Sequence, residues 1–263
     1  MLKIKFKKFL ILECVEYYFW FDNKKYWFLD LVSIYYLDKQ LKNHKYNQEC
    51  LYTWITSLKE SNEEIFNKFS KTVKNEIRRA GREWVMYYIN NNPNEDDLKK
   101  YHDYYNIFRK SKGLPPVSFF SILKYKNYIK LTYSKVKDEI LSYHLYIYDF
   151  SIKKVRLLQS CSLFREKNCW KEFINLIWYA NKGLHYRDMN YFKDKWFVEY
   201  DRWWLYLWDT DKQKINIDKF KLSFSPNIIK VYKYEKVNTL VKLFYPLYMW
   251  LCTIKNSIRK FWF

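Results

Sequence analysis

The stretch that decides the fold is Tyr200-Asp-Arg-Trp-Trp-Leu-Tyr-Leu-Trp-Asp209, in which three Trp fall within six positions. An apolar, strand-like run, FVEYD (197–201), ends here on an acid, and the chain is expected to turn. Such turns favour Gly, because many of them need a positive φ that costs a residue with a side chain free energy. The backbone conformation expected here therefore favours Gly, although the sequence has Trp.

Two more Trp stand where Gly is expected. Trp84 follows a helix whose last turn is predicted at residues 79–83, and Trp196 follows one that is predicted to end at residues 193–195. The position after a helix commonly adopts the left-handed conformation, in which Gly is preferred. The turn predicted at Trp203 and Trp204 poses the same requirement.

The amino-acid composition is likewise poor in Gly and rich in Trp. The chain has 3 Gly and 12 Trp among 263 residues, and Gly and Trp together come to about 6% of the chain, near the average for Gly alone. We hypothesise that several Trp are Gly in the source organism, at UGA codons that its genetic code reads as Gly. The alternative is a stacking or interface patch of Trp203, Trp204 and Trp208. The positions in question are Trp84, Trp178, Trp196, Trp203, Trp204 and Trp208.

The bulk composition predicts a folded, basic protein. Hydrophobic residues make up 49% of the chain and aromatic residues 22%, and the formal net charge is +20. Such a charge indicates a polyanionic partner or an anionic membrane surface, although the abundance of Lys, Asn, Ile, Tyr and Phe is also typical of AT-rich coding. The five Cys form no C-x-x-C pair and the four His are scattered, so no metal site is expected and a cytoplasmic location is favoured.

The C-terminus is predicted to be a separate element. Residues 240–254 are apolar but too few to span a bilayer, and basic residues follow them. They fit either a helix packed on the core or an amphipathic helix lying on the inner face of the membrane. We therefore divide the chain into a main domain, 1–237, and a basic amphipathic helix, 238–263.

Hydrophobic periodicity predicts an α/β fold with a mixed, mostly antiparallel sheet. Aromatic runs within residues 1–58 predict strands, and an apolar stripe from Ser61 to Trp84 predicts one helix, with Ser61 and Glu64 as its capping box. A second helix is bounded by Asn94 and the acidic residues 95–97 at its start, and by Gly113 at its end. An alternating meander over 129–157 precedes helical spacing at 170–195, which we interpret as two helices broken near Gly183.

Two groups of polar residues suggest binding or catalysis. A basic ridge beside the first apolar stripe would suit a phosphate-bearing substrate, and it contains Lys74, Arg78 and Arg82. His185 and Asp188 lie three residues apart on one helical face, so Asp188 could orient the imidazole of His185 as a general base. Each group also fits an ordinary solvated surface.

Several segments resemble the FemAB-like branch of the GNAT acyltransferases, which includes proteins of bacterial cell-envelope polysaccharide synthesis. The resemblance covers roughly residues 50–235, and its strand before the turn typically ends in Asp-Phe-Gly-Gly, where this chain has Asp201-Arg-Trp-Trp204. The segments are KFSKTVKNEIRRAGRE (68–83), KSKGLPP (110–116), VRLLQSCSLFRE (155–166), ANKGLHYRDMNYFKDK (180–195), FVEYD (197–201) and DKFKLSF (218–224).

The resemblance implies a GNAT-like sheet and direct transfer of an acyl or aminoacyl group to a cell-envelope sugar or lipid-linked precursor. The donor would be acyl-CoA, such as acetyl-CoA, or aminoacyl-tRNA. Phosphates of the donor would meet a helix N-terminus in the region of Ser162, Arg165 and Asn181. Asp201, beside the suspected turn, joins His185 and Asp188 as a catalytic candidate, and Lys221 is a candidate for binding substrate.

A different class of function also fits the composition. Basic residues with interleaved Tyr could bind RNA or single-stranded nucleic acid by stacking and charge. No RNP, KH, helix-turn-helix or zinc signature accompanies them.

Overall fold

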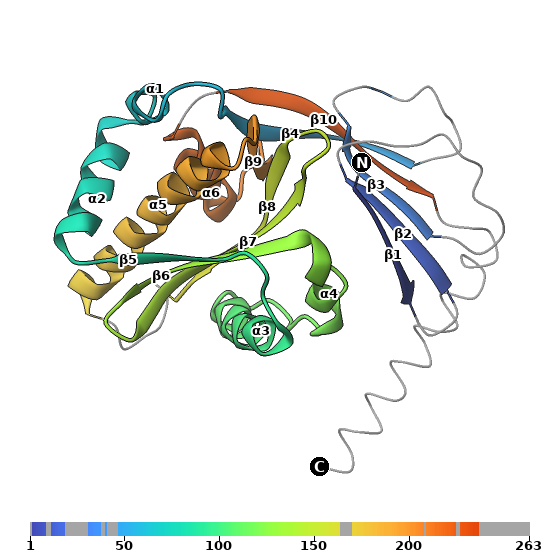
Figure 1. Cartoon of the computed structure of the whole chain (residues 1–263), viewed down its shortest axis with the longest axis horizontal. Helices are drawn as coiled ribbons and strands as arrows, with labels where there is room; N and C mark the ends of the chain where they lie inside the picture. The colour runs from blue at the N-terminus through green and yellow to red at the C-terminus, as the bar shows by residue number, and fades with distance from the viewer. Residues whose placement is uncertain are drawn as a thin grey trace, which may run out of the picture. The chain divides into compact units, whose positions relative to one another are not determined.

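A computed structural model describes most of the chain (Figure 1). The described residues are 2–8, 12–18, 31–37, 40, 47–163, 170–207, 209–224 and 227–236. The predicted amphipathic helix at 238–263 lies outside them. In chain order the elements are β1 (Leu2–Lys8), β2 (Leu12–Tyr18), β3 (Leu31–Leu37), β4 (Asn47–Ser57), α1 (Asn62–Asn67), α2 (Lys71–Arg82), β5 (Met86–Asn90), α3 (Glu95–Ser111), α4 (Phe120–Leu123), η1 (Lys126–Tyr128), β6 (Ile129–Val136), β7 (Glu139–Asp149), β8 (Lys154–Ser162), α5 (Lys171–Asp194), β9 (Glu199–Leu205), α6 (Lys212–Leu222) and β10 (Ile228–Lys236).

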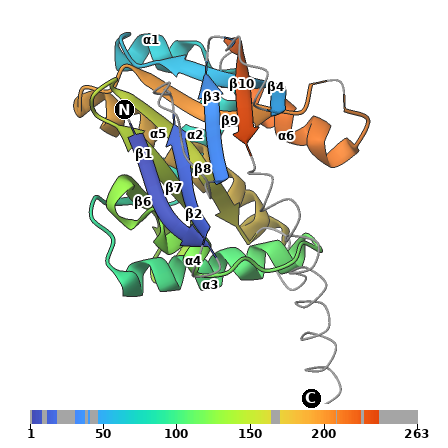
Figure 2. The same ribbon diagram turned by 90° about the vertical axis from the view of Figure 1, so that its right-hand side faces the viewer.

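The chain divides into two compact units. One comprises Met1–Cys50 together with Val231–Phe263, and the other comprises Leu51–Lys230. In the first, β1 pairs antiparallel with β2, β2 pairs parallel with β3, and β3 pairs antiparallel with β10. Figure 2 shows these strands in the order β1, β2, β3 and β10.

The second unit has a mixed, mostly antiparallel sheet flanked by helices, as the sequence predicts. Its strand order is β4-β9-β8-β7-β6-β5. The pairing is antiparallel except between β8 and β9, which run parallel. The predicted meander is confirmed as β6, β7 and β8.

Helices cover both faces of this sheet (Figure 1). Alternation along β7 directs Tyr143 and Leu145 into a cluster with α3 and α4, and Tyr146 into a cluster with α2 and α5. His144 points to the same side as Tyr146, because it bonds to residues of α5. Because its side chains alternate, β7 contributes apolar residues to the cores on both faces of the sheet and places two polar groups, those of His144 and Tyr146, beneath α5.

The first predicted helix is two helices. Ser61 and Glu64 form the expected capping box of α1, but the side chain of Ser70 then caps α2 by accepting from the N–H of Val73. The apolar stripe spans both helices because Ile65 of α1 and Val73 of α2 enter the same core. The break between α1 and α2 could not be seen in the sequence, because hydrophobic periodicity indicates which residues are buried and does not show whether the helix backbone is continuous.

The predicted break near Gly183 is wrong, since α5 runs unbroken from Lys171 to Asp194. Gly183 is instead required by packing, because a Cβ there would overlap the phenol of Tyr87. A glycine inside a helix can mark close approach of a neighbour as well as a helix end.

The two Trp predicted after helices do adopt the left-handed conformation. Trp84 has φ 58° and Trp196 has φ 65°. The N–H of Trp84 bonds to Gly81 O at 3.4 Å, and that of the next residue, Val85, bonds to Ala80 O at 3.2 Å. This pair of bonds defines a Schellman C-cap, in which glycine is the usual left-handed residue.

The same C-cap recurs at α5 and at α3. At the end of α5, Trp196 N–H bonds to Lys193 O at 2.9 Å, and Phe197 N–H bonds to Phe192 O at 3.1 Å. At the end of α3 the left-handed residue is Gly113, with φ 68°. Within the described residues, the motif is therefore built once on glycine and twice on tryptophan.

The predicted turn at residues 203 and 204 is instead a bulge inside β9. Thr53 pairs with Trp204 and Ile55 pairs with Asp201, so two residues of β9 oppose the single residue Trp54. Trp203 has φ 77° at this bulge, where a left-handed glycine is common.

Left-handed geometry therefore holds for three of the six suspected positions. Trp178 lies inside α5 and Trp204 inside β9, and neither has a positive φ. Trp208 lies outside the described residues. Among the helices of the described segments, none combines the length and apolar character needed to cross a bilayer.

Candidate functional site

A cavity opens in the second unit where two parallel strands stop pairing. β8 and β9 pair only at residues 154–156 and 199–201, although both strands continue beyond that point. The cavity has a volume of about 390 Å³ and is lined by residues of α3, β8, α5, β9 and α6. Along residues 157–162, β8 pairs with β7 on one side only, so its other edge faces the opening.

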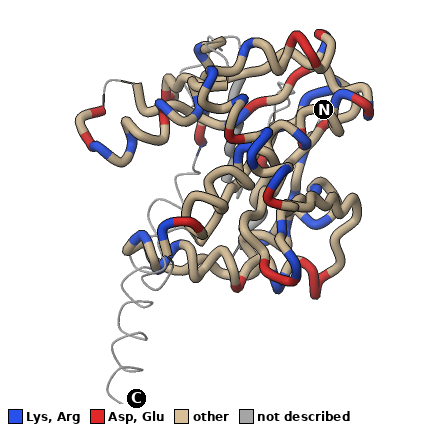
Figure 3. Tube along the Cα trace, turned by 90° about the vertical axis from the view of Figure 1, so that its left-hand side faces the viewer, with Lys and Arg blue, Asp and Glu red and all other residues tan. Residues whose placement is uncertain are grey.

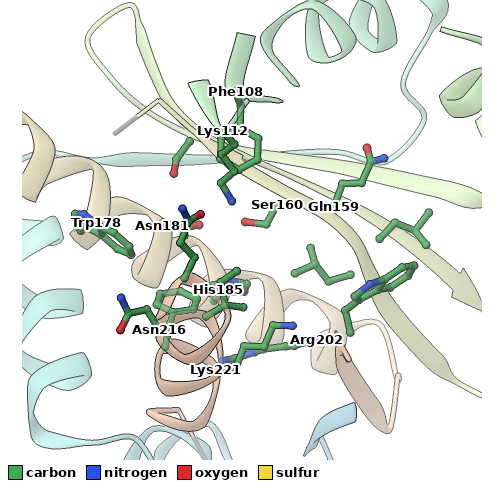
Figure 4. Close-up of a pocket in the computed structure, with 17 residues that line it drawn as sticks. Phe108, Lys112, Gln159, Ser160, Trp178, Asn181, His185, Arg202, Asn216 and Lys221 are labelled. Carbon is green, nitrogen blue, oxygen red and sulfur yellow. The ribbon is translucent and has the colours of Figure 1, made fainter. Parts of the chain in front are cut away.

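Two cations lie together on one side of this cavity, Arg202 from β9 and Lys221 from α6 (Figure 4). Burial lowers the pKa of Arg202 to about 9 and that of Lys221 to about 8. Lys221 Nζ donates to the backbone oxygen of Trp204 at 2.5 Å. Both side chains have thus lost water that would normally solvate their charge.

His185 of α5 also lines the cavity. Burial, followed by the charges of His144, Arg202 and Lys221, holds the pKa of His185 well below its usual value. Its Nδ1 lies 3.1 Å from the hydroxyl of Tyr200. At neutral pH the imidazole of His185 is therefore uncharged.

Asp188 does not orient His185, contrary to the prediction. Its Oδ2 lies 2.7 Å from His144 Nδ1 and accepts from the hydroxyl of Tyr146 at 2.6 Å. The spacing of three residues placed His185 and Asp188 on neighbouring positions of α5, but β7 supplies the histidine that Asp188 binds.

His144 connects this buried group back to the cavity. Its Nε2 lies 2.8 Å from Oδ1 of Asn181, which lines the cavity. On the other side, the hydroxyl groups of Tyr146 and Tyr200 lie 2.6 Å apart, and Tyr200 in turn meets His185. A continuous polar network thus runs from His185 to Asn181 beneath α5.

Asp201 organises the bulge and does not line the cavity. Its Oδ1 accepts from the Trp203 N–H at 2.8 Å and from Thr53 Oγ1 at 2.5 Å. Its Oδ2 accepts from Nε of Arg156 at 2.8 Å. With its oxygens engaged and the side chain buried, Asp201 fixes the backbone that presents Arg202 and Trp203 to the cavity.

The predicted donor-binding residues are only partly brought together. Ser162, at the end of β8, lines the cavity with Asn181, but Asn181 lies well inside α5 and not at its N-terminus. Arg165 lies outside the described residues. Trp170 precedes α5 and provides no side-chain cap to its first turn.

The predicted basic ridge lies elsewhere. Arg78 and Arg82 line a separate surface hollow, and Lys74 Nζ donates to the backbone oxygen of Asn67 at 3.3 Å. Basic and acidic segments are interspersed along the trace in Figure 3. The structure therefore separates the ridge from the cavity that holds His185 and Lys221.

Sequence reasoning missed four residues of the site: His144, Tyr146, Tyr200 and Arg202. The alternation of β7 could have placed His144 and Tyr146 on one face. Arg202 stood out only as a departure from the resembled pattern. In the described part of the chain, no group of three or more His, Cys, Asp or Glu could hold a metal ion.

No protein-family model matches the sequence, and no curated protein matches it. Solved structures do match. FemX has a TM-score of 0.57 at 14% identity, covering 78% of this chain and 66% of its own. L-PGS from Bacillus licheniformis has a TM-score of 0.51 at 12% identity, covering 78% of this chain and 68% of its own.

A third similar structure is the C-terminal domain of a protein from Agrobacterium fabrum described as a lysylphosphatidylglycerol synthetase. It has a TM-score of 0.53 at 9% identity, covering 82% of this chain and 70% of the domain chain. The chain spans just under two thirds of FemX. The predicted FemAB-like fold is therefore confirmed, at a level of identity that speaks for the fold alone.

Proposed function

We propose that the protein is an acyltransferase or aminoacyltransferase that acts on a cell-envelope acceptor, a sugar or a lipid-linked precursor. The observation that carries the proposal is the cavity between β8 and β9, with an uncharged His185 in its wall and an unpaired strand edge beside it. The likeness to FemX and to a lysylphosphatidylglycerol synthetase supports this class of reaction.

His185 is the residue that we assign as general base. An amine or hydroxyl of the acceptor would lose its proton to the imidazole and attack the carbonyl carbon of the activated donor. The new bond to the acceptor forms as the bond to the thiol or ribose oxygen of the donor breaks, and the leaving group takes up a proton. The depressed pKa of His185 keeps the imidazole uncharged at neutral pH, and it also makes the imidazole a weaker base than a solvent-exposed histidine.

Tyr200 orients the base. Its hydroxyl meets His185 Nδ1, and Tyr146 fixes the same hydroxyl from the other side. This bond selects which ring nitrogen of His185 is available toward the cavity. Backbone N–H groups on the free edge of β8 are suited to binding the donor and its developing oxyanion.

The donor is acyl-CoA, or aminoacyl-tRNA as the alternative. Direct transfer needs positioning and a proton acceptor, and it needs no covalent enzyme intermediate. Ser162, at the end of β8, and Asn181 would contact the donor or acceptor from the cavity wall. Membrane contact through residues 238–263 stays a prediction from the sequence.

The test is a transfer assay with each donor class. Purified protein is incubated with radiolabelled acetyl-CoA or with aminoacyl-tRNA, together with lipid-linked and nucleotide-linked cell-envelope precursors. The proposal predicts a labelled product that His185→Gln reduces by about 10²- to 10⁴-fold. Folded protein that transfers label from neither donor would contradict it, and salt-sensitive RNA binding without transfer would favour the nucleic-acid alternative.

A further inference from the structure

Arg202 is a buried cation held between aromatic rings. Its guanidinium carbon lies 4.0 Å from the ring centroid of Trp54 and 3.7 Å from that of Phe224, and the residue is 1% exposed. Aromatic faces attract a guanidinium but accept no N–H hydrogen bonds of ordinary strength. The sandwich therefore fixes the plane of the group and leaves its donors to be satisfied elsewhere.

Two of those donors are not satisfied within the described segments, because Nε and Nη1 of Arg202 are buried without a hydrogen-bond partner. Nη2 meets the weak acceptor Sδ of Met189 at 3.5 Å, and the side chain of Tyr200 also makes a hydrogen-bond contact with the guanidinium. A guanidinium carries five N–H donors, and leaving them dry and unpaired is unfavourable. Because the side chain lines the cavity, a ligand there can reach it.

The neighbouring carboxylates are engaged with other groups. Asp188 binds His144, and Asp201 binds Arg156. Asp218 accepts from the backbone N–H of Tyr206 at 3.0 Å. None of the three forms an ion pair with Arg202 among the described residues. The charge of Arg202 thus has aromatic neighbours and no direct counter-ion.

Lys221 adds a second positive charge to the site. Its ammonium group and Arg202 repel each other, and both lower the pKa of the adjacent His185. Lys221 has three donors and makes one bond, to Trp204 O. Two desolvated cations beside a neutral imidazole form a site whose missing component is negative charge.

We propose that Arg202 and Lys221 form an oxyanion-binding site on one side of the cavity, which takes the carboxylate or phosphate group of a substrate. The inference rests on the proposed function in treating the cavity as the substrate site. An oxyanion there would pair with both cations and accept from the free guanidinium donors. The aromatic sandwich would hold Arg202 ready before the ligand arrives.

The test measures anion binding without any donor. Thermal unfolding of the full chain is followed with sodium phosphate or sodium acetate, with sodium chloride balancing ionic strength. We expect at least one of these anions to raise the Tm of the wild type above the chloride baseline. A response to phosphate alone indicates a phosphate-bearing substrate, and a response to acetate alone indicates a carboxylate.

Arg202→Met and Lys221→Met should each weaken the apparent affinity by about tenfold or more. Lys110→Met is the matched control, because Lys110 is exposed on α3 and the variant loses the same charge away from the cavity. Without anion, Arg202→Met should melt at or above the wild-type temperature, because an apolar side chain replaces an unpaired buried charge.

Two results would overturn the proposal: a wild type that responds to neither anion, and an Arg202→Met variant that keeps the full response. If Arg202→Met does not fold, Lys221→Met decides the question by itself. Failure of the transfer assay with intact anion binding would count against the proposed function and not against this site.

Discussion

Replacing Trp84 or Trp196 by Gly should stabilise the protein, and replacing either by Ala should not. Both residues sit at the left-handed position of a Schellman cap, with φ 58° and 65°. Their side chains are 83% and 80% exposed, so little buried area is lost with the indole. Because both substitutions remove the indole, the difference between the Gly and Ala variants isolates the backbone.

The magnitude follows from two opposing terms. A Cβ in the left-handed region costs roughly 1–2 kcal/mol. Gly in turn loses more freedom on folding than Ala, by about 0.4–1 kcal/mol. The Gly variant should therefore exceed the Ala variant by about 0.5–1 kcal/mol at each position, or about 2 °C in Tm for a chain of this size.

Matched positions supply the controls. Gly113→Ala should lower stability by a similar amount, because nothing lies within 4 Å of the added Cβ and only the φ of 68° opposes it. At Ile107, an exposed position inside α3, the order should reverse, with Ala above Gly by about 1 kcal/mol. Equal stability of the Gly and Ala variants at Trp84 and Trp196 would refute the reasoning.

The codons at positions 84, 196 and 203 test the genetic-code hypothesis separately. UGA at these positions, in an organism that reads it as Gly, is the expected result. UGG codons would show that the protein carries the strained tryptophans natively. At Trp203, Gly would also enlarge the cavity, because the indole forms part of its wall.

Three further outcomes follow from the site and the packing. Tyr200→Phe should lower the transfer rate about tenfold by removing the hydrogen bond to His185. The apparent pKa of the base in the pH–rate profile should also shift. If acetate is the anion that raises the Tm, its affinity should fall as pH rises through about 8, because Lys221 is charged below its pKa of about 8 and neutral above it; an unchanged affinity at pH 9 would contradict this. Gly183→Ala should cost about 1–3 kcal/mol in a denaturant titration, since its Cβ meets Tyr87, and a neutral effect would show that the phenol can move.

Local signals in the sequence predicted local structure well. The capping box at Ser61, the α3 boundaries and the meander are short-range patterns, and the structure confirms them. The left-handed conformations of Trp84 and Trp196 were also predicted, because a helix end fixes the backbone of the next residue.

The site depended on long-range pairing that no local pattern reports. Asp188 meets His144 across 44 residues, so the prediction that it would orient His185 had no way to include β7. Arg202 became part of the site through the bulge that Asp201 holds, which is set by pairing with β4. The basic ridge at Arg78 lies at a hollow separate from the cavity, and its predicted role in binding a phosphate-bearing substrate stays a prediction.

A crystal structure of the protein with whichever donor supports transfer would test the central claim most directly. We predict the acyl carbonyl in the cavity between residues 157–162 of β8 and the bulge at Trp203, with His185 beside the position of the attacking group. An acyl group bound outside this cavity, for example in the hollow beside α2, would contradict the account.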